Sequence, residues 1–308
     1  MITALSGGTG SIKLVRGLAS LDEELVVIIN VGDNTTIHGF YVAPDVDTVL
    51  YGLSGLLDEK RGWGIKGDTF NYLDQVNRLR GETWFNLGDR DIAIHALRTA
   101  LMRYGHSLSS VTANISERLG VNVKAIPASD EVIQTKIKIS EKEIPFQEYW
   151  VKRKAKDKVL GVKYDGDKRA LPAPGVIDAI VSSECVVLCP ANPITSISPI
   201  LAIPKVRKIL KETSSKVVAV SPFIRESPIS GPAGKLMEGL GLEVSSIGVA
   251  RLYKDFLDAI VIDAKDEVFK DRIEALGVKV FLYDIVMSDR VDENLLAKFV
   301  LRSSRSLL

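Results

Sequence analysis

The chain has 308 residues, of which 46% are hydrophobic and 26% are charged, as in an ordinary globular protein. Its 40 Lys and Arg side chains balance 39 Asp and Glu side chains, so the net charge of +1 gives no overall field that would attract nucleic acid or an acidic membrane. The apolar stretches are too short to span a bilayer, and we expect a cytoplasmic protein without a targeting leader. Three histidines and two cysteines show no zinc-ligand spacing, which leaves oxygen-bound metals.

Seven short apolar runs, each ending in polar or turn-forming residues, alternate with segments of helical periodicity. This alternation predicts an α/β fold with a doubly wound, mainly parallel Rossmann-like sheet. The predicted strands lie at 2–5, 25–31, 121–126, 185–189, 217–220, 259–262 and 278–282. Later helical patterns cover 198–211, which ends in lysines that suit the helix dipole, and 292–302, with Asp292 as the predicted N-cap.

The first predicted strand runs directly into Gly7-Gly8-Thr9-Gly10 and then into a helical pattern. Glycine lets the backbone bend tightly and approach a ligand closely, and the start of the following helix presents free N–H groups and a positive dipole end. The pattern therefore predicts a phosphate-binding turn. It matches neither the dinucleotide fingerprint nor the P-loop, because Lys13 follows at the wrong distance. A packing turn that holds no ligand is the alternative.

Two stretches interrupt the alternation of strands and helices. Residues 43–120 show helical patterns, which predicts a helical insertion that forms a lid and acceptor site; the nucleotide-binding core would then comprise 1–42 and 121–308. These helical patterns lie at 48–57, 69–80, 90–104 and 109–119. Residues 132–167 alternate charged and β-forming side chains, which predicts a small antiparallel ribbon. Its basic run at 152–156 suits either phosphate binding or protection of an exposed strand edge.

Acidic residues cluster at two places in the insertion. Asp45 and Asp47 precede one predicted helix, and Asp89 and Asp91 flank Arg90 before another. Carboxylates at this spacing suit a Mg²⁺ ion that also binds substrate phosphates. Asp47 and Asp89 are equally suited to N-cap the helices that they precede. Arg90 is either a structural ion-pair partner or a clamp for a transferring phosphoryl group.

A polar turn follows the fourth predicted strand. Asn192, Thr195 and Ser196 place uncharged hydrogen-bonding groups just before a helical pattern. Ligands of doubly wound sheets bind at the carboxyl ends of the strands where the strand order reverses. We therefore predict a second phosphate- or sugar-binding turn opposite the glycine turn. N-capping by Ser196 or Ser198 is the alternative.

The motifs taken together are distinctive. They are Ser-Gly-Gly-Thr-Gly at 6–10 with Lys13, Pro-Asp-Val-Asp-Thr-Val-Leu-Tyr at 44–51, Trp-Gly at 63–64, Leu-Gly-Asp-Arg-Asp at 87–91, Asn-Pro-Ile-Thr-Ser-Ile at 192–197 and Ser-Gly-Pro-Ala-Gly-Lys-Leu-Met at 230–237. In this order, over nearly the whole chain, they resemble the 2-phospho-L-lactate transferases of deazaflavin coenzyme F-420 biosynthesis.

The resemblance implies a reaction and its partners. The terminal ribityl hydroxyl of the deazaflavin FO would attack the lactate-bearing phosphorus of lactyl-2-diphospho-5'-guanosine, or of its enolpyruvyl analogue, and GMP would leave. The sequence does not discriminate between the two donors. Mg²⁺ is the implied cofactor, and no covalent nucleophile is expected, because positioning and charge neutralisation carry such a transfer. A homodimer is a family-level expectation.

The resemblance also implies roles for individual residues. The implied catalytic residues are Asp45, Asp47, Asp89 and Arg90, of which Asp45 and Asp47 are also the implied metal ligands; which of these two acts as the base stays open. The implied substrate-binding residues are Gly7, Gly8, Thr9, Gly10, Lys13, Asn86, Asp91, Asn192, Thr195 and Ser196. The first turn and the 192–196 turn would hold the guanosine diphosphate moiety, while Asn86 and the 89–91 corner would close over the acceptor.

Two positions depart from the family pattern. The loop after the second strand commonly carries adjacent acids, whereas here Asn34 follows Asp33, so a metal role of this loop stays open. The family's Pro-Ser-Asn-Pro has Ala191 in place of the serine, which leaves more of the binding to Asn192. The alternative function is a nucleotide-sugar-binding regulatory protein of the same fold. A nicotinamide dehydrogenase is disfavoured by the atypical glycine turn.

Overall fold

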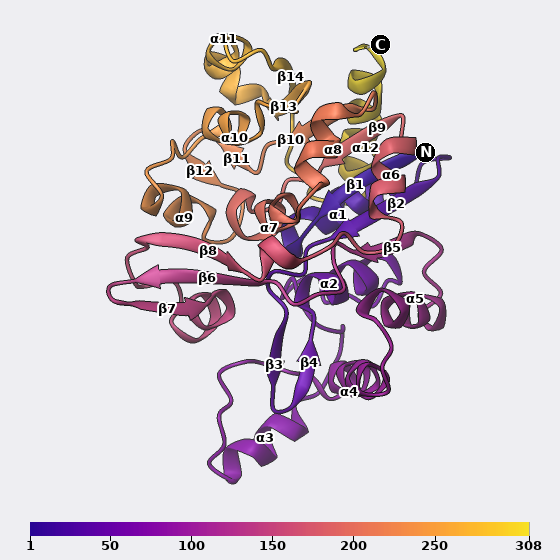
Figure 1. The fold of residues 1–308 in the computed structure, drawn as a ribbon, viewed down its shortest axis with the longest axis vertical. Coiled ribbons are helices and arrows are strands. Elements are labelled where there is room, and N and C mark those ends of the chain that lie inside the picture. The colour runs from indigo at the N-terminus through magenta and orange to yellow at the C-terminus, as the bar shows by residue number, and fades with distance from the viewer. Residues whose placement is uncertain (308) are drawn as a thin grey trace.

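The computed structural model describes residues 1–307 and is built around a seven-stranded parallel sheet (Figure 1). The strand order is β14-β13-β10-β9-β1-β2-β5. Each predicted strand is present: β1 (Ile2–Ser6), β2 (Leu25–Ile29), β5 (Lys124–Pro127), β9 (Cys185–Leu188), β10 (Lys216–Val220), β13 (Ala259–Asp263) and β14 (Lys279–Tyr283). The predicted α/β class with a doubly wound parallel sheet is confirmed.

The strand order reverses between β1 and β9. Strand β1 pairs with β2 on one side, where Ile2 is opposite Leu25, and with β9 on the other, where Ile2 is opposite Cys185. From β1 the sheet continues through β2 to β5 in one direction and from β9 to β14 in the other. The carboxyl ends of β1 and β9 therefore flank the position where ligands bind in sheets of this kind.

Both faces of the sheet are covered by helices. Alternate side chains of β2 enter opposite layers, Val26 and Ile28 one and Val27 and Ile29 the other, and all four are buried. Burial on both faces explains why the strands are continuous apolar runs. The layer that contains Val27 is covered by α1 (Gly8–Ala19), α2 (Pro44–Leu53), α5 (Leu108–Arg118) and α12 (Arg290–Arg305).

The remaining helices cover the other layer or lie at its ends. They are α6 (Val176–Ser182), α7 (Ser198–Ala202), α8 (Val206–Glu212), α9 (Ala233–Gly239), α10 (Ser246–Tyr253) and α11 (Lys270–Glu274), with the short helices η1 (Glu148–Lys152), η2 (Asp167–Arg169), η3 (Pro193–Ile197) and η4 (Ala264–Phe269). Within residues 1–307, no helix combines the length and the apolar character needed to cross a membrane.

The insertion holds helices in each of its predicted segments, namely α2, α3 (Asn71–Arg78), α4 (Asp89–Arg103) and α5. A hairpin of β3 (Thr35–Ile37) and β4 (Phe40–Val42), which the sequence did not predict, precedes them. Figure 1 shows this hairpin extending away from the main sheet, beside α4 and toward α3. The division of the chain into core and insertion stays a prediction.

The predicted antiparallel ribbon is present as a three-stranded sheet. Strand β6 (Gln134–Ile139) lies between β7 (Lys142–Pro145) and β8 (Gly161–Asp165) and is antiparallel to both. A two-residue pairing of β11 (Phe223–Ile224) with β12 (Ser227–Pro228) forms a further small hairpin.

Two predictions about helices are wrong. The helix predicted over 198–211 is broken into α7 and α8, because Pro204 lacks an N–H group and forces Ile203 into extended backbone with φ −63° and ψ 125°. The N-cap of the last helix is Asp289 instead of Asp292, since the Asp289 carboxylate accepts hydrogen bonds from the backbone N–H groups of Val291 and Asp292 at 2.8 and 3.0 Å.

Candidate functional site

The glycine turn joins β1 to α1 in a conformation that requires small residues. Gly8 has φ +67°, in the left-handed region that favours glycine. The Ser11 hydroxyl donates to the Gly7 carbonyl oxygen at 2.8 Å and accepts from the Gly7 N–H at 3.0 Å, which tightens the turn. A Cβ on Gly7 would lie 2.7 Å from Ser196 Cβ and 2.8 Å from Asp45 Oδ2. The turn therefore has the 192–196 turn and the start of α2 as direct neighbours.

The 192–196 turn keeps a hydrogen-bond donor free. Asn192 Oδ1 accepts from the backbone N–H groups of Ile194 and Thr195 at 3.0 and 3.3 Å, so Asn192 caps η3. Its Nδ2 is buried and has no hydrogen-bond partner within residues 1–307. The Ser198 hydroxyl donates to the Pro193 carbonyl oxygen at 2.6 Å. A ligand oxygen at this turn would satisfy the Asn192 amide.

Asn30 connects the two turns, and sequence analysis did not single it out. It is fully buried at the end of β2. Its Nδ2 donates to Asp45 Oδ2 at 2.8 Å and to the Thr195 carbonyl oxygen at 3.0 Å, while its Oδ1 accepts from the Gly32 N–H at 2.8 Å. The available signal was a lone amide at the end of an apolar strand next to the central one.

Asp33 and Asp45 are both buried, and the charge of Asp45 acts on Asp33. Burial raises the pKa of Asp45 to about 6, although hydrogen bonds from Asn30 and the Gly8 N–H counteract part of the shift. Burial and, next, the charge on Asp45 raise the pKa of Asp33 well above its usual value. Asp33 Oδ1 also has no hydrogen-bond partner within residues 1–307. A divalent cation would compensate this concentration of negative charge.

The pair would supply part of a metal-ligand set. No group of three or more His, Cys, Asp or Glu side chains in residues 1–307 is arranged to hold a metal ion. Mg²⁺ is commonly held by one or two carboxylates, with water and substrate phosphates as its other ligands. The donor chemistry of Asp33 and Asp45 fits that pattern.

Asp47 points away from Asp45. Both residues belong to the first turn of α2, and side chains two positions apart on a helix differ in direction by about 200°. Asp47 faces α4, where Arg98 Nη1 donates to its Oδ2 at 3.1 Å and Nη2 donates to its Oδ1. Burial lowers the pKa of the Arg98 guanidinium, but Asp47 more than offsets this, and the pKa is raised. Asp45 and Asp47 thus face different parts of the molecule.

Asp89 caps α3 instead of the helix that it begins. Its carboxylate accepts from Thr69 Oγ1 at 2.6 Å and from the backbone N–H groups of Asn71 and Tyr72 at 3.0 and 2.9 Å. These hydrogen bonds, that of Thr69 first, lower the pKa of Asp89 to about 2. Asp68 in turn caps α4 by accepting from the backbone N–H groups of residues 90 and 91.

The other implied residues of the insertion lie in different surroundings. Asp91 is buried, and its Oδ1 accepts from the Tyr51 hydroxyl at 2.5 Å and lies 3.2 Å from His95 Nε2. Burial raises the pKa of Asp91, but His95 and Tyr51 outweigh it, so the pKa is lowered. Arg90 is exposed and donates to the Lys66 carbonyl oxygen at 3.2 Å. Asn86 is exposed in the loop before α4.

Two residues near the glycine turn contact other segments. Lys13 Nζ donates to the Met287 carbonyl oxygen at 2.5 Å, which directs it toward the segment before α12. The Thr9 hydroxyl donates to the Gly62 carbonyl oxygen at 2.8 Å. The insertion loop that carries Trp63 therefore lies against the start of α1.

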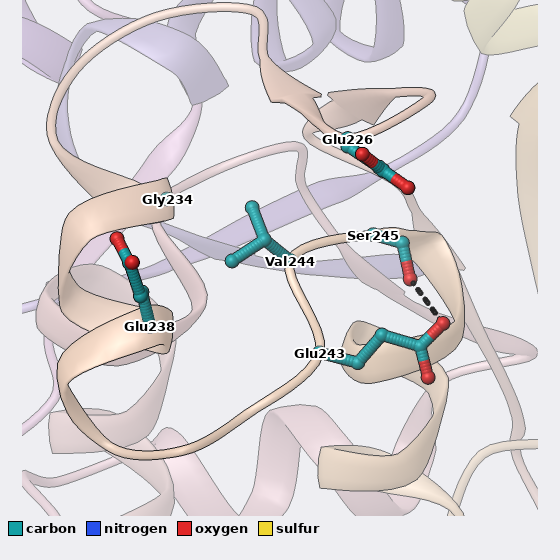
Figure 2. Close-up of a pocket in the computed structure, with 6 residues that line it drawn as sticks. All are labelled: Glu226, Gly234, Glu238, Glu243, Val244 and Ser245. Atoms are coloured by element: carbon teal, nitrogen blue, oxygen red, sulfur yellow. Dashed lines mark hydrogen bonds between the residues drawn. The ribbon is translucent and has the colours of Figure 1, made fainter.

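A cavity of about 460 Å³ opens elsewhere, between α9 and α10. It is lined by Glu226, Gly234, Glu238, Glu243, Val244 and Ser245, and Figure 2 shows the three glutamate side chains around it. Glu243 Oε1 accepts from the Ser245 hydroxyl at 3.2 Å. The three glutamate carboxylates that line the cavity would repel a phosphate, so this cavity is not the predicted diphosphate site.

A family model described as 2-phospho-L-lactate transferase CofD matches residues 2–294. The chain belongs to the 2-phospho-L-lactate transferase family. Proteins named 2-phospho-L-lactate transferase are similar over their full length. That from Methanosarcina mazei is 40% identical, covering 97% of this chain and 98% of the relative, and that from Methanothermobacter thermautotrophicus is 42% identical, covering 98% and 97%.

Membership of the 2-phospho-L-lactate transferase family confirms the resemblance read from the motifs. It makes the chain a transferase of F-420 biosynthesis and disfavours the regulatory alternative. A crystal structure of a UPF0052 family protein from Bacillus halodurans has the same fold, with a TM-score of 0.66 at 17% identity, covering 97% of this chain and 99% of that protein.

The structural position of Asp89 gives a testable pH dependence. A carboxylate whose pKa is lowered to about 2 from 3.8 stabilises the fold above pH 4, and this contribution is lost as the pH falls from about 4 toward 2. We expect Asp89→Asn to lower the melting temperature at pH 7 and to converge with the wild type on acidification. Thermal unfolding between pH 7 and pH 3 measures this. A constant difference over that range would contradict the assignment.

Proposed function

We propose that this member of the 2-phospho-L-lactate transferase family moves the phospholactyl group of lactyl-2-diphospho-5'-guanosine, or its enolpyruvyl analogue, to the terminal ribityl hydroxyl of FO and releases GMP. One observation carries the proposal. The glycine turn after β1 and the 192–196 turn after β9 meet at the reversal of strand order, and Asn30 joins the second turn to the carboxylate of Asp45.

The diphosphate of the donor would lie between the two turns. The start of α1 supplies N–H groups and the positive end of the helix dipole. Asn192 supplies a free amide donor, and Ser196 of the same turn borders the glycine turn. Thr195 is buried beside it in η3. These groups bind phosphate oxygens without a formal positive charge, so the negative charge of the diphosphate needs a separate counter-ion.

Mg²⁺ would be that counter-ion, held by Asp33 and Asp45. When bound, the cation would neutralise charge that develops on the diphosphate oxygens during transfer. The raised pKa of both carboxyls and the unpaired Asp33 Oδ1 support the assignment. Asp47 is left out of the proposed ligand set, because Arg98 engages both of its oxygens.

The transfer itself needs little covalent chemistry from the protein. The ribityl hydroxyl loses its proton, which is released to solvent, and its oxygen forms a bond to the lactate-bearing phosphorus. The bond from that phosphorus to the GMP oxygen breaks, with its electron pair remaining on GMP. The chain would bind the donor, align the acceptor hydroxyl and exclude water from the reacting phosphorus. The loop around Trp63, whose Gly62 carbonyl oxygen accepts a hydrogen bond from Thr9, would cover the donor.

The direct test is turnover by the purified protein. With FO, the guanosine-linked donor and Mg²⁺, we expect GMP and phospholactyl-FO in equal amounts, and EDTA should abolish both. Asp45→Asn should lower kcat by about 100-fold or more, because it removes one of the two proposed ligand charges. Donor binding in calorimetry without any product from the wild type would contradict the proposal and favour a binding protein.

The role of Asn192 is tested by Asn192→Asp. This variant keeps an oxygen to cap η3 but replaces the free amide donor with a negative oxygen, so we expect the donor Kd to rise by about tenfold or more. Ser198→Ala is the matched control. It removes a hydroxyl from the same turn, but that hydroxyl donates to the Pro193 carbonyl oxygen and so is already paired within the protein. Donor affinities measured by calorimetry should change for the first variant alone; an unchanged affinity in Asn192→Asp would remove this residue from the donor site.

A further inference from the structure

Five buried polar side chains join α2 to α4, outside the proposed diphosphate site. Asp47 and Tyr51 come from α2, and Asp91, His95 and Arg98 come from α4. In addition to the Asp47–Arg98 ion pair and the hydrogen bond of Tyr51 to Asp91, His95 lies 3.5 Å from Asp47 through Nδ1 and 3.2 Å from Asp91 through Nε2. The network therefore joins α2 to α4 through three residue pairs, Asp47–Arg98, Asp47–His95 and Tyr51–Asp91.

Burial of this network is poorly explained by stability alone. Removing two charges from water costs about as much as their attraction returns, and apolar side chains of similar volume often serve equally well. Arg98 is fully buried, and its Nε has no hydrogen-bond partner within residues 1–307. The ion pair also fixes geometry. A guanidinium that binds both oxygens of one carboxylate fixes the orientation of that carboxylate relative to the guanidinium.

Orientation of α2 matters for the proposed site. Asp45 lies on the same helical turn as Asp47 and faces the opposite side. Asp45 Oδ2 accepts from Asn30 at 2.8 Å and lies 2.8 Å from where a Cβ of Gly7 would be. A small rotation of α2 about its axis would either press Asp45 into the glycine turn or withdraw it from Asn30.

We propose that Asp47 and Arg98 are positioning residues, which set the rotation of α2 so that Asp45 faces the glycine turn. Asp47 acts through Arg98 and binds neither substrate nor metal. The inference rests on the proposed function, since it takes Asp45 as a ligand of the cation. In the Pro-Asp-Val-Asp segment, Asp45 would then bind the cation, and Asp47 would bind Arg98 of α4.

A double-mutant cycle on metal affinity tests this inference without relying on turnover. The probe is Mn²⁺, whose binding is measured by electron paramagnetic resonance. Asp47→Leu and Arg98→Met each leave one buried charge without its partner, so each should raise the Mn²⁺ Kd by about tenfold. The double variant D47L/R98M has no unpaired charge and similar volume, and its Kd should return to within about threefold of the wild type.

Other outcomes overturn the inference. If Asp47 binds the metal, Arg98→Met leaves the Kd unchanged and the double variant stays as impaired as Asp47→Leu. If the pair serves stability alone, neither single variant changes the Kd of the folded protein. Arg98→Lys keeps the positive charge but loses the planar guanidinium that binds both carboxylate oxygens, and should give a smaller rise in Kd than Arg98→Met. This variant replaces the double-mutant cycle if the double variant does not fold.

The control is a buried ion pair at the opposite end of α1 from the glycine turn. Arg16 binds Glu293 through Nε at 3.0 Å and Nη2 at 2.5 Å, and so joins the end of α1 to α12. Glu293→Gln should lower the melting temperature without changing the Mn²⁺ Kd. A wild-type protein that binds no Mn²⁺ would contradict the metal assignment of the proposed function, whereas a wild type that binds Mn²⁺ with unaffected single variants would contradict the positioning role alone.

Discussion

The buried amide of Asn30 is the interaction on which the site depends. Side-chain amides in the interior must have their hydrogen bonds satisfied, because an unpaired group costs about 1–3 kcal/mol. Asn30 satisfies its own by binding three separate segments: the loop after β2 through Gly32, the first turn of α2 through Asp45, and the 192–196 turn through Thr195. One side chain thus holds together the loops that follow β2 and β9, beside the turn that follows β1.

The first turn of α2 carries the second constraint. An acidic pair separated by one residue would act together on a strand but is divided on a helix. Asp45 consequently faces the glycine turn, where burial raises the pKa of its carboxyl, and burial together with the charge on Asp45 raises the pKa of Asp33. Asp47 is neutralised by Arg98 on the other side. Unbalanced negative charge is therefore concentrated where a cation would be needed.

Local sequence patterns were sufficient for the sheet and the two turns. The strands are continuous apolar runs because both faces are buried, and glycine at position 8 is required by a positive φ. Partners distant in sequence were not predictable in this way. Asp47 and Arg98 are separated by 51 positions, and nothing near either residue indicates the other.

The wrong or missing predictions for Asp89, Pro204 and Asn30 also come from reading local sequence patterns alone. Asp89 looked like an N-cap of α4 because it precedes that helix, but its hydrogen bonds go to residues 17 to 20 positions earlier in the chain. The break at Pro204 was visible in the sequence, whereas the helical spacing around it favoured one continuous helix. Asn30 was overlooked because a single polar residue at a strand end is also common in turns.

The central claim is that the two turns and the Asp33–Asp45 pair form one binding site for a metal-bound nucleoside diphosphate. A crystal structure with GDP and Mn²⁺, with the metal located by its anomalous scattering, tests it most directly. The account predicts the diphosphate between Gly8 and Asn192, with the manganese peak beside Asp33 and Asp45. Manganese bound at Asp47 and Asp91, or a diphosphate bound away from the glycine turn, would contradict it.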